Sequence, residues 1–172
     1  MDTIEAIRTR RSIRKFKDIS VSPEKIEAVL EAGMYAPSAR NEQPWHFMVI
    51  SDEALKDKLM NAHPYAKMLK EAPIAILVCA DKNLELSPGY WPIDCSAATQ
   101  NILLAAHASG LGAVWLGVHP RKEREDAIRK ILKLPHNIEP FSLIALGYPN
   151  EQKEAQSRFN ASRVHYNSWN RT

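Results

Sequence analysis

Apolar residues recur along this chain at helical spacing in some segments and in unbroken runs in others. Segment 22–34 starts with a serine that can cap a helix and a proline suited to its first turn, and then carries apolar residues three and four positions apart. This pattern predicts a helix whose end is marked by Gly33. Further helices are predicted at the start of the chain, ending near Arg10, and over 51–62, 92–109 and 121–132.

Four apolar runs predict β-strands, at Trp45–Ile50, Ile74–Ala80, Ala113–Val118 and Phe141–Leu146. The second run is apolar at every position, which is typical of a strand buried on both faces. Helices and strands alternate unevenly, and the chain has no internal repeat or linker. We therefore expect residues 1–172 to form a single layered domain of α/β type.

The segment from Gly147 onward is a polar tail with few periodic apolar residues, so it is expected to fray. It nevertheless carries Phe159, Tyr166 and Trp169. These aromatic side chains need an apolar surface to pack on. A partner subunit or the chain's own domain can supply that surface, and the sequence leaves both alternatives open.

The composition is that of a folded domain, with 172 residues of which 45% are hydrophobic and 25% charged. Its 23 Lys and Arg residues against 20 Asp and Glu leave a net charge of +3, too small by itself to predict a nucleic-acid or membrane partner. No apolar run is long enough to span a bilayer, and Asp2 and Glu5 precede any apolar stretch, unlike in a secretory signal. Cys79 and Cys95 form no CxxC motif, and a cytoplasmic protein is expected.

The sequence carries no motif for a metal site or for nucleophilic hydrolysis. Its six histidines are scattered without an HExxH pattern, and no GxSxG motif occurs, so no metal site is expected. Gly110-Leu111-Gly112 lies between a predicted helix and a predicted strand, the reverse of the order in a dinucleotide-binding turn. A helix end explains Gly110, whereas Gly117 at the end of a strand leaves room for a flat ligand against the backbone.

Three polar features remain as candidate ligand contacts. The run Arg10–Lys15 holds four cations and a serine hydroxyl, a set that suits a phosphate group, although a charge run of this kind is more often an ordinary solvated patch. The loop Pro37–Trp45 carries amide and hydroxyl groups between prolines, which suits the polar edge of a heterocycle and equally a surface turn. Arg158 is a cation in the tail. Together these features match one ligand with a phosphate, a polar-edged ring and an apolar face, as in a cofactor that brings its own reactivity.

The chain resembles the short members of the flavin-dependent nitroreductase family. Four segments carry the resemblance in the family's order and spacing, and these are Arg10–Phe16, Ala36–Phe47, Gly110–Gly117 and Ala145–Pro149. The resemblance implies an α+β fold of three layers, in which helices flank a central mixed, mostly antiparallel sheet. It also implies a homodimer with FMN at the subunit interface and a C-terminal tail that wraps the partner.

The resemblance further implies FMN contacts at individual positions. Contacts to the phosphate and ribityl chain are implied for Arg10, Arg11, Ser12 and Arg14, with Arg158 at the phosphate. Contacts to the isoalloxazine ring from the other subunit are implied for Pro37, Ser38, Ala39 and Asn41. Backbone N–H groups near flavin N5 and O4 are implied for Leu116 and Gly117, and a cation at the pyrimidine edge is implied for Lys67. No side chain is implied to be catalytic, because flavin N5 carries the hydride.

The activity that the resemblance implies is FMN-dependent oxidation of NADH or NADPH, with ping-pong transfer to a small acceptor such as a nitroaromatic or a quinone. A specialised reaction within the family, reductive dehalogenation or flavin fragmentation, is one alternative. The other is a non-catalytic module that binds phosphate or nucleic acid through Arg10–Lys15. The tryptophans do not interleave with that basic run, so we expect a small-molecule partner, with no nucleic acid and no membrane.

Overall fold

The computed structural model describes residues 1–169, and residues 170–172 of the expected domain lie outside the described residues. Its α-helices are α1 (Thr3–Thr9), α2 (Pro23–Met34), α3 (Glu53–Ala62), α4 (Trp91–Ala108) and α5 (Lys122–Leu132). Its strands are β1 (Trp45–Ile50), β2 (Ile74–Asp81), β3 (Gly112–Gly117) and β4 (Ile138–Gly147). Three short 3-10 helices are η1 (Ala39–Asn41), η2 (Lys67–Lys70) and η3 (Ala161–Arg163).

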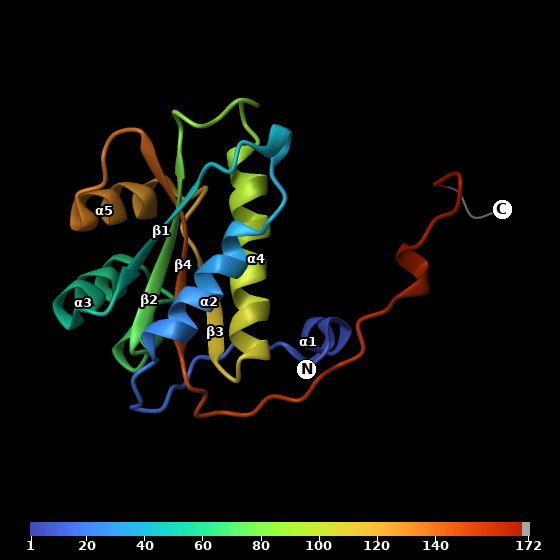
Figure 1. Ribbon diagram of the computed structural model, residues 1–172, viewed down its shortest axis with the longest axis horizontal. Coiled ribbons are helices and arrows are strands. Elements are labelled where there is room, and N and C mark those ends of the chain that lie inside the picture. The colour runs from blue at the N-terminus through green and yellow to red at the C-terminus, as the bar shows by residue number, and fades with distance from the viewer. Residues whose placement is uncertain (170–172) are drawn as a thin grey trace.

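The four strands form one sheet in the order β1-β2-β4-β3, and each neighbouring pair is antiparallel. A single parallel bridge joins Ser12 to Ala113 on the open side of β3. Helices α2 and α4 cover one face of the sheet and α3 and α5 the other, which gives three layers (Figure 1). The expected α+β class is therefore confirmed.

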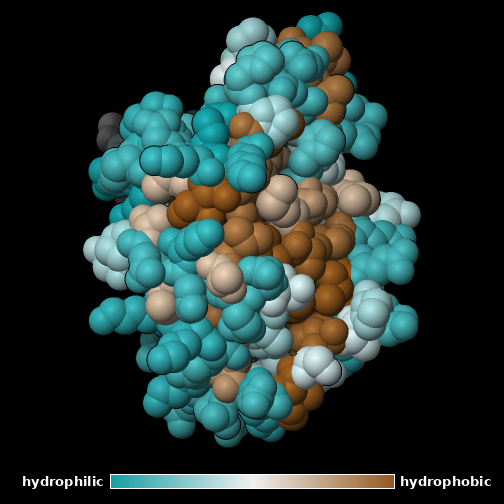
Figure 2. Space-filling view, turned by 90° about the vertical axis from the view of Figure 1, so that its left-hand side faces the viewer, coloured by the Kyte–Doolittle hydropathy of each residue, from teal (hydrophilic) through white to brown (hydrophobic). Residues whose placement is uncertain are grey.

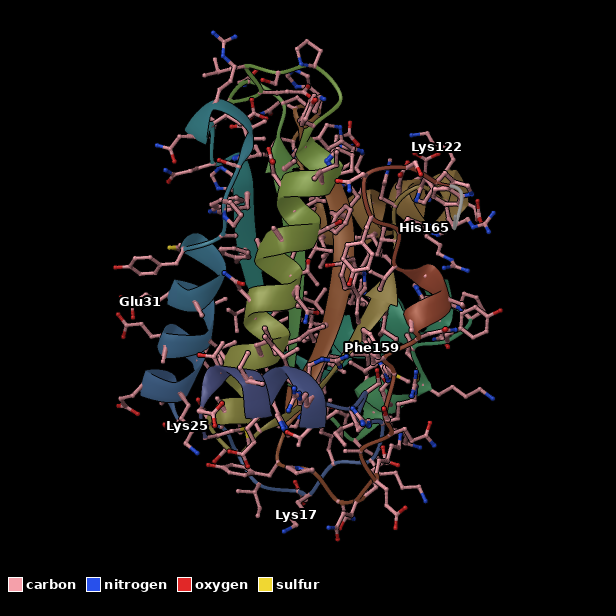
Figure 3. All side chains as sticks on the ribbon, turned by 90° about the vertical axis from the view of Figure 1, so that its right-hand side faces the viewer. Lys17, Lys25, Glu31, Lys122, Phe159 and His165 are labelled. Atoms are coloured by element: carbon pink, nitrogen blue, oxygen red, sulfur yellow. The ribbon has the colours of Figure 1, made fainter. Side chains whose placement is uncertain are left out.

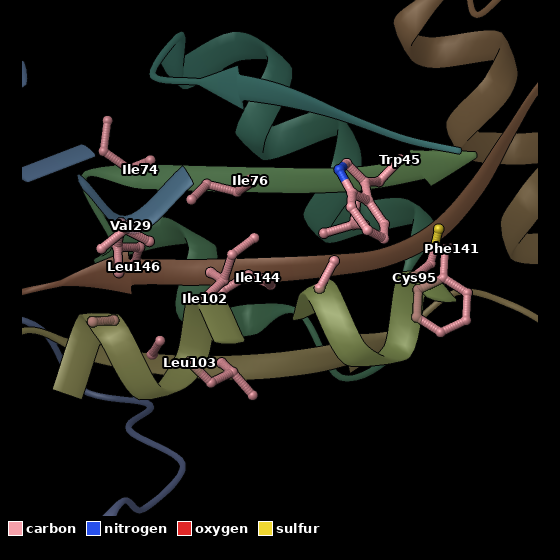
Figure 4. Close-up of a cluster of buried hydrophobic side chains, with 14 of the residues drawn as sticks. Val29, Trp45, Ile74, Ile76, Cys95, Ile102, Leu103, Phe141, Ile144 and Leu146 are labelled. Carbon is pink, nitrogen blue, oxygen red and sulfur yellow. The ribbon is translucent and has the colours of Figure 1, made fainter. Parts of the chain in front are cut away.

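Alternation along the central strands builds the core on both faces of the sheet. In β2, Ile74, Ile76 and Val78 point to the face under α2 and α4, and Ala75 and Leu77 point to the opposite face. Figure 4 shows the first of these clusters, in which side chains of β2 and β4 meet those of α2 and α4. A strand with two buried faces has no polar positions, which explains the unbroken apolar run in the sequence.

Gly33 has a different role from the one predicted for it. Helix α2 continues past it to Met34, so the expectation that Gly33 ends this helix is wrong. A Cβ atom at Gly33 would lie 2.9 Å from Cγ1 of Ile102 in α4 and 3.1 Å from Cζ of Phe47. The glycine is therefore required for the close approach of α2 to α4. Gly110, by contrast, has a φ of +76° directly after α4 and fits the predicted helix end.

The edge strand β1 leaves apolar side chains exposed. Met48 and Val49 are partly exposed, and Met34 at the end of α2 is exposed as well. Hydrophobic colour is continuous over part of the face seen in Figure 2. None of the helices in residues 1–169 is both long enough and apolar enough to cross a membrane.

The tail first follows the N-terminal segment and then leaves the body of the molecule (Figure 1). Arg11 Nε donates to the carbonyl of Glu154 at 2.9 Å, and Lys153 Nζ donates to the carbonyl of Ser12 at 2.7 Å. Beyond this stretch, Phe159, Tyr166 and Trp169 are each more than 80% exposed. These three aromatic side chains thus stay largely exposed instead of packing on the chain's own domain.

Candidate functional site

Arginines of α1, of the segment after it and of the tail face one open groove. The groove has a volume of about 650 Å³ and is lined by Ile7, Arg8, Arg10, Arg11, Gln100 and residues 155–159. These lining residues include no carboxylate. Burial lowers the pKa of Arg10, and the charges of Arg158 and Arg11 lower it further, as expected for cations crowded together. The groove is thus built to receive an anion.

Arg11 is held in place by three backbone carbonyls. Its Nη1 donates to the carbonyls of Arg8 and Arg10, and its Nε to that of Glu154. Its Nη2 is shielded from solvent and has no partner among the described residues. This guanidinium keeps its full charge beside the groove, because carbonyl groups orient it without neutralising it.

Ser12 and Arg14 do not line this groove. Ser12 bridges to Ala113, and its carbonyl accepts from Lys153. Arg14 is exposed, and its backbone N–H donates to a carboxylate oxygen of Glu151. Of the residues implied to contact the phosphate and ribityl chain, the structure brings Arg10, Arg11 and Arg158 together in the groove. Ser12 and Arg14 lie outside it.

The open edge of β3 presents the backbone of Gly117. The N–H of Ile13 donates to the carbonyl of Ala113 at 3.0 Å on this edge, whereas the N–H of Val118 donates inward to Phe141 of β4 at 3.3 Å. Because these groups alternate along an antiparallel strand, Gly117 N–H points to the open edge and Leu116 N–H points to β4. The position of a Cβ at Gly117 has no atom within 4 Å, so a flat ligand can approach the backbone there.

The segment that follows α3 is attached to this edge. His63 is buried, and its Nε2 lies 2.9 Å from the carbonyl oxygen of Gly117. Lys67 follows four residues later, at the first position of η2, and is exposed. Arg124 of α5 also donates to the Gly117 carbonyl, at 2.8 Å. The predicted Lys67 thus belongs to a loop fixed to β3 through His63.

The loop that holds Pro37, Ser38, Ala39 and Asn41 lies near the N-terminal end of α4 (Figure 1). Its backbone takes unusual conformations, since φ is +50° at Arg40 and +57° at Asn41. The N–H of Ala39 donates to Oδ1 of Asp94 at 3.0 Å, and the hydroxyl of Ser38 accepts from the N–H of Gln43 at 3.0 Å. These bonds hold the turn, and Pro37 and Asn41 remain exposed.

The loop lies at the N-terminal end of α4, whereas the groove reaches the middle of this helix at Gln100 and extends towards its C-terminal half. Asp94 holds the loop, and His107, thirteen positions later on α4, lies 2.8 Å from the hydroxyl of Thr9 beside the groove. Thirteen residues of helix span about 20 Å. In one chain, therefore, the loop residues and the arginines do not meet. Sequence reasoning missed Asp94 and His63, because their partners lie 55 and 54 positions away in the chain. It also missed Arg124, whose partner Gly117 is seven positions away but is reached only because the chain turns between β3 and α5.

Burial raises the pKa of both cysteine thiols, to about 12 for Cys79. Both cysteines are free, and the thiol of Cys95 points to the carbonyl of Cys79 at 3.7 Å. These thiols are therefore protonated core groups and contribute nothing to the candidate site.

Comparison with known proteins identifies the family. The model of the nitroreductase family matches residues 7–63 and 60–148. A protein of Methanothermobacter thermautotrophicus, provisionally named NADH dehydrogenase/NAD(P)H nitroreductase, is 50% identical over 169 residues, which cover 98% of this chain and 88% of that protein. The structure is similar to an FMN-dependent nitroreductase of Clostridium difficile, with a TM-score of 0.89, 34% identity, and coverage of 96% of this chain and 99% of that one.

A second similar structure is that of a protein of Desulfovibrio desulfuricans, provisionally named a nitroreductase, which was determined in complex with FMN. It has a TM-score of 0.84 and 34% identity, and 98% of each chain is covered. The family model covers most of the chain, and the relatives match nearly all of it. The chain therefore belongs to the nitroreductase family.

Proposed function

We propose that this protein is an FMN-dependent NAD(P)H oxidoreductase that forms one domain over residues 1–172 and acts as a homodimer. The observation that carries the proposal is the arginine groove, in which cations converge without a carboxylate. A phosphate monoester carries between one and two negative charges near neutral pH and accepts several charge-assisted hydrogen bonds. The groove therefore fits the phosphate of FMN, and two solved relatives are described with this cofactor.

Within this proposal, the cofactor is held from the groove to the edge of β3. Arg10, Arg11 and Arg158 bind the phosphate, while Ser12 and Arg14 follow in the same segment along the ribityl chain. Gly117 then presents its N–H to the polar edge of the ring, and the absence of a side chain lets the ring lie close. Leu116, whose side chain is buried, anchors this part of the strand, and Lys67 lies on the adjoining loop.

The homodimer follows from the separation of the two halves of the predicted site. The loop with Pro37, Ser38, Ala39 and Asn41 is held at the N-terminal end of α4, whereas the contact between Thr9 of α1 and His107 lies near the other end of this helix, beside the groove. A second copy of the chain is therefore needed to bring such a loop to the ring. The tail supports the same arrangement. It projects from the body, and Figure 3 labels Phe159 and His165 along it. Its exposed aromatic side chains fit the apolar surface of a partner better than water.

When bound, FMN supplies the chemistry by accepting a hydride at N5 from a nicotinamide and passing electrons to a second substrate. The chain's own residues position the cofactor and exclude water from one side of its ring. Since one open ring face serves both substrates in turn, we expect ping-pong kinetics with nitroaromatic or quinone acceptors.

The direct test is optical and anaerobic. The purified protein, supplied with FMN, is expected to be yellow after removal of free cofactor, and NADH or NADPH is expected to bleach it. Turnover with a panel of acceptors then separates nitro and quinone reduction from dehalogenation and flavin fragmentation. A protein that stays colourless after incubation with FMN contradicts the proposal.

A further inference from the structure

The carbonyl of Gly117 accepts two hydrogen bonds from side chains of two different segments. His63 Nε2 lies 2.9 Å from it, in the loop after α3, and Arg124 Nη1 lies 2.8 Å from it, in the first turn of α5. Both donors belong to the layer that covers one face of the sheet, whereas Gly117 ends an edge strand. Together they fix the open edge of β3 at the place where a flat ligand can approach.

The protonation state of His63 follows from its two neighbours. The backbone N–H of Tyr65 donates to Nδ1 at 3.2 Å, so Nε2 carries the proton and donates to Gly117. Burial lowers the pKa of His63, and the charge of Arg124 lowers it further. The imidazole is therefore neutral at neutral pH, and the positive charge at this carbonyl comes from Arg124 alone.

The charge of Arg124 is not compensated by a carboxylate. Its neighbours on α5 have their own ion pairs, Glu125 with His119 at 2.8 Å and Asp126 with Lys122 at 2.8 Å. Among residues 1–169, Arg124 forms no salt bridge, and its Nε is shielded without a hydrogen-bond partner. The guanidinium carbon lies 5.6 Å from the centre of the Tyr65 ring, which orients the group without neutralising it.

We propose that Arg124, held against Gly117 by the carbonyl bond and the Tyr65 ring, is the cation that stabilises the reduced form of a flavin bound at the open edge of β3. This inference rests on the proposed function. Hydride transfer breaks a C–H bond of the nicotinamide, forms an N–H bond at flavin N5 and brings a negative charge onto the ring. A fixed and partly buried cation stabilises such a charge more strongly than a mobile surface cation does.

Lys67 is the other cation that could stabilise the negative charge of the reduced ring. It is exposed, and no hydrogen bond or ion pair fixes its ammonium group among the described residues. Water screens an exposed ammonium group, and its flexible side chain costs entropy to order. Arg124 is already ordered by two neighbours, so we expect the larger effect from Arg124.

The experiment measures the dissociation constants of oxidised and reduced FMN anaerobically for the wild type and for Arg124→Gln. The variant removes the charge and retains a donor for the Gly117 carbonyl. We expect reduced FMN to bind about tenfold more weakly, with a change of less than threefold for oxidised FMN. Arg124→Lys is expected to restore part of the loss. Arg121→Gln, an exposed change of equal charge at the cap of the same helix, is expected to leave both constants unchanged.

The outcomes separate this inference from the proposed function. If the wild type does not bind FMN, the proposed function itself fails. If the wild type binds FMN and Arg124→Gln weakens both forms equally, Arg124 has only a structural role and the inference is overturned. A selective loss of reduced FMN in Lys67→Gln instead of Arg124→Gln overturns it too. Arg124→Met, which keeps the packing on Tyr65, provides the same comparison if the glutamine variant does not fold.

Discussion

Two regions along α4 carry excess charge of opposite sign, positive in the groove and negative at the N-terminal end of the helix. The structure compensates these two charges in different ways. Near the C-terminal half of α4, Arg10, Arg11 and Arg158 face a groove without a carboxylate. At the N-terminal end, Asp94 and Glu42 are both buried, and among residues 1–169 each keeps one carboxyl oxygen without a hydrogen-bond donor. The arginines are open to a ligand, whereas the acids are enclosed by the chain.

The acidic pair can be balanced internally by a proton. Burial raises the pKa of Asp94, and the neighbouring carboxyl group of Glu42 raises it further. Glu42 accepts from the N–H groups of Leu86 and Ser87 at 2.7 and 2.8 Å, while Asp94 accepts from Ala39. These bonds attach Asp94 of α4 to the Pro37–Asn41 loop and Glu42 to the 82–90 segment, and a proton that Asp94 retains can be donated to Glu42. Glu85, which also raises the pKa of Asp94, is itself paired with Lys82.

The comparison shows which charges point to a ligand. A buried carboxyl pair removes its own repulsion by binding a proton, so it needs no outside partner. Arginine cannot lose its proton at physiological pH, so its repulsion persists until an anion arrives. We therefore propose the cationic end as the binding region, whereas the acidic end supports the loop.

The largest expected effect is on the cationic end. In the double variant Arg10→Gln and Arg158→Gln, the affinity for FMN is expected to fall by at least about 100-fold, since two charge-assisted hydrogen bonds are lost. Riboflavin lacks the phosphate, so its affinity is expected to change by less than threefold. Fluorescence titration measures both constants, and Lys17→Gln, an exposed change of the same kind, serves as the control. Equal losses for FMN and riboflavin would show that the groove does not bind the phosphate.

The next effect concerns the acidic end. Because its folded pKa is raised, Asp94 holds a proton more strongly in the folded than in the unfolded state, and stability is lost as pH rises through the folded pKa. Asp94→Asn supplies a permanent donor to Glu42 and is expected to be more stable than the wild type by about 1 kcal/mol at pH 8. The gain should vanish towards pH 4. Urea unfolding at both pH values measures it, with exposed Glu27→Gln as the matched control.

A gain for Asp94→Asn that is the same at pH 4 and pH 8 would contradict a raised pKa of Asp94. A loss at both pH values would do so as well, because it would mean that the ionised carboxylate is the stabilising form.

A smaller effect links the groove to His107. Burial lowers the pKa of this histidine, and the charges of Arg10 and Arg11 lower it further. An anion in the groove offsets those charges, so the pKa of His107 is expected to rise when inorganic phosphate binds. NMR titration of the imidazole with and without phosphate measures the change. His46, exposed and on β1, is the internal reference. A pKa of His107 that does not respond to phosphate would place the anion elsewhere.

The smallest expected effect is on pH-dependent stability. The folded pKa values of His63 and His107 lie below the ordinary value, so the unfolded state binds protons more strongly there. Stability is therefore expected to be complete above the unfolded pKa of about 6.5 and to fall as pH drops below it. His63→Gln, whose amide can donate to Gly117 and accept from Tyr65, should reduce this dependence. An unchanged slope between pH 7 and pH 5 in that variant would contradict a buried neutral His63.

The sequence predicted the elements well because their signals are local. Asp2, Ser22 and Asp52 each accept a hydrogen bond at the start of a helix, and the apolar run of β2 is buried on both faces, as its pattern indicates. Gly33 was misassigned because a glycine near a helix end has two explanations, a cap or a close contact. Only the position of Ile102 decides between them.

The site was predictable only in part, because its geometry depends on contacts between distant segments. The run Arg10–Lys15 was recognised, but the sequence does not show that Arg10 and Arg11 face the groove while Arg14 faces solvent. The bond between His63 and Gly117 joins positions 54 residues apart, and Leu86 lies 44 residues from Glu42. No local pattern connects such positions, so these partners emerge only from the fold.

The central claim is that one FMN is held by the arginines of one chain and covered by the loop of another. A crystal structure of the protein with FMN tests it most directly. We expect the phosphate within hydrogen-bond distance of Arg10 and Arg158 of one subunit, and the ring in contact with the partner's copy of the Pro37–Asn41 loop. A phosphate outside the groove, or a ring enclosed by a single chain, would contradict the account.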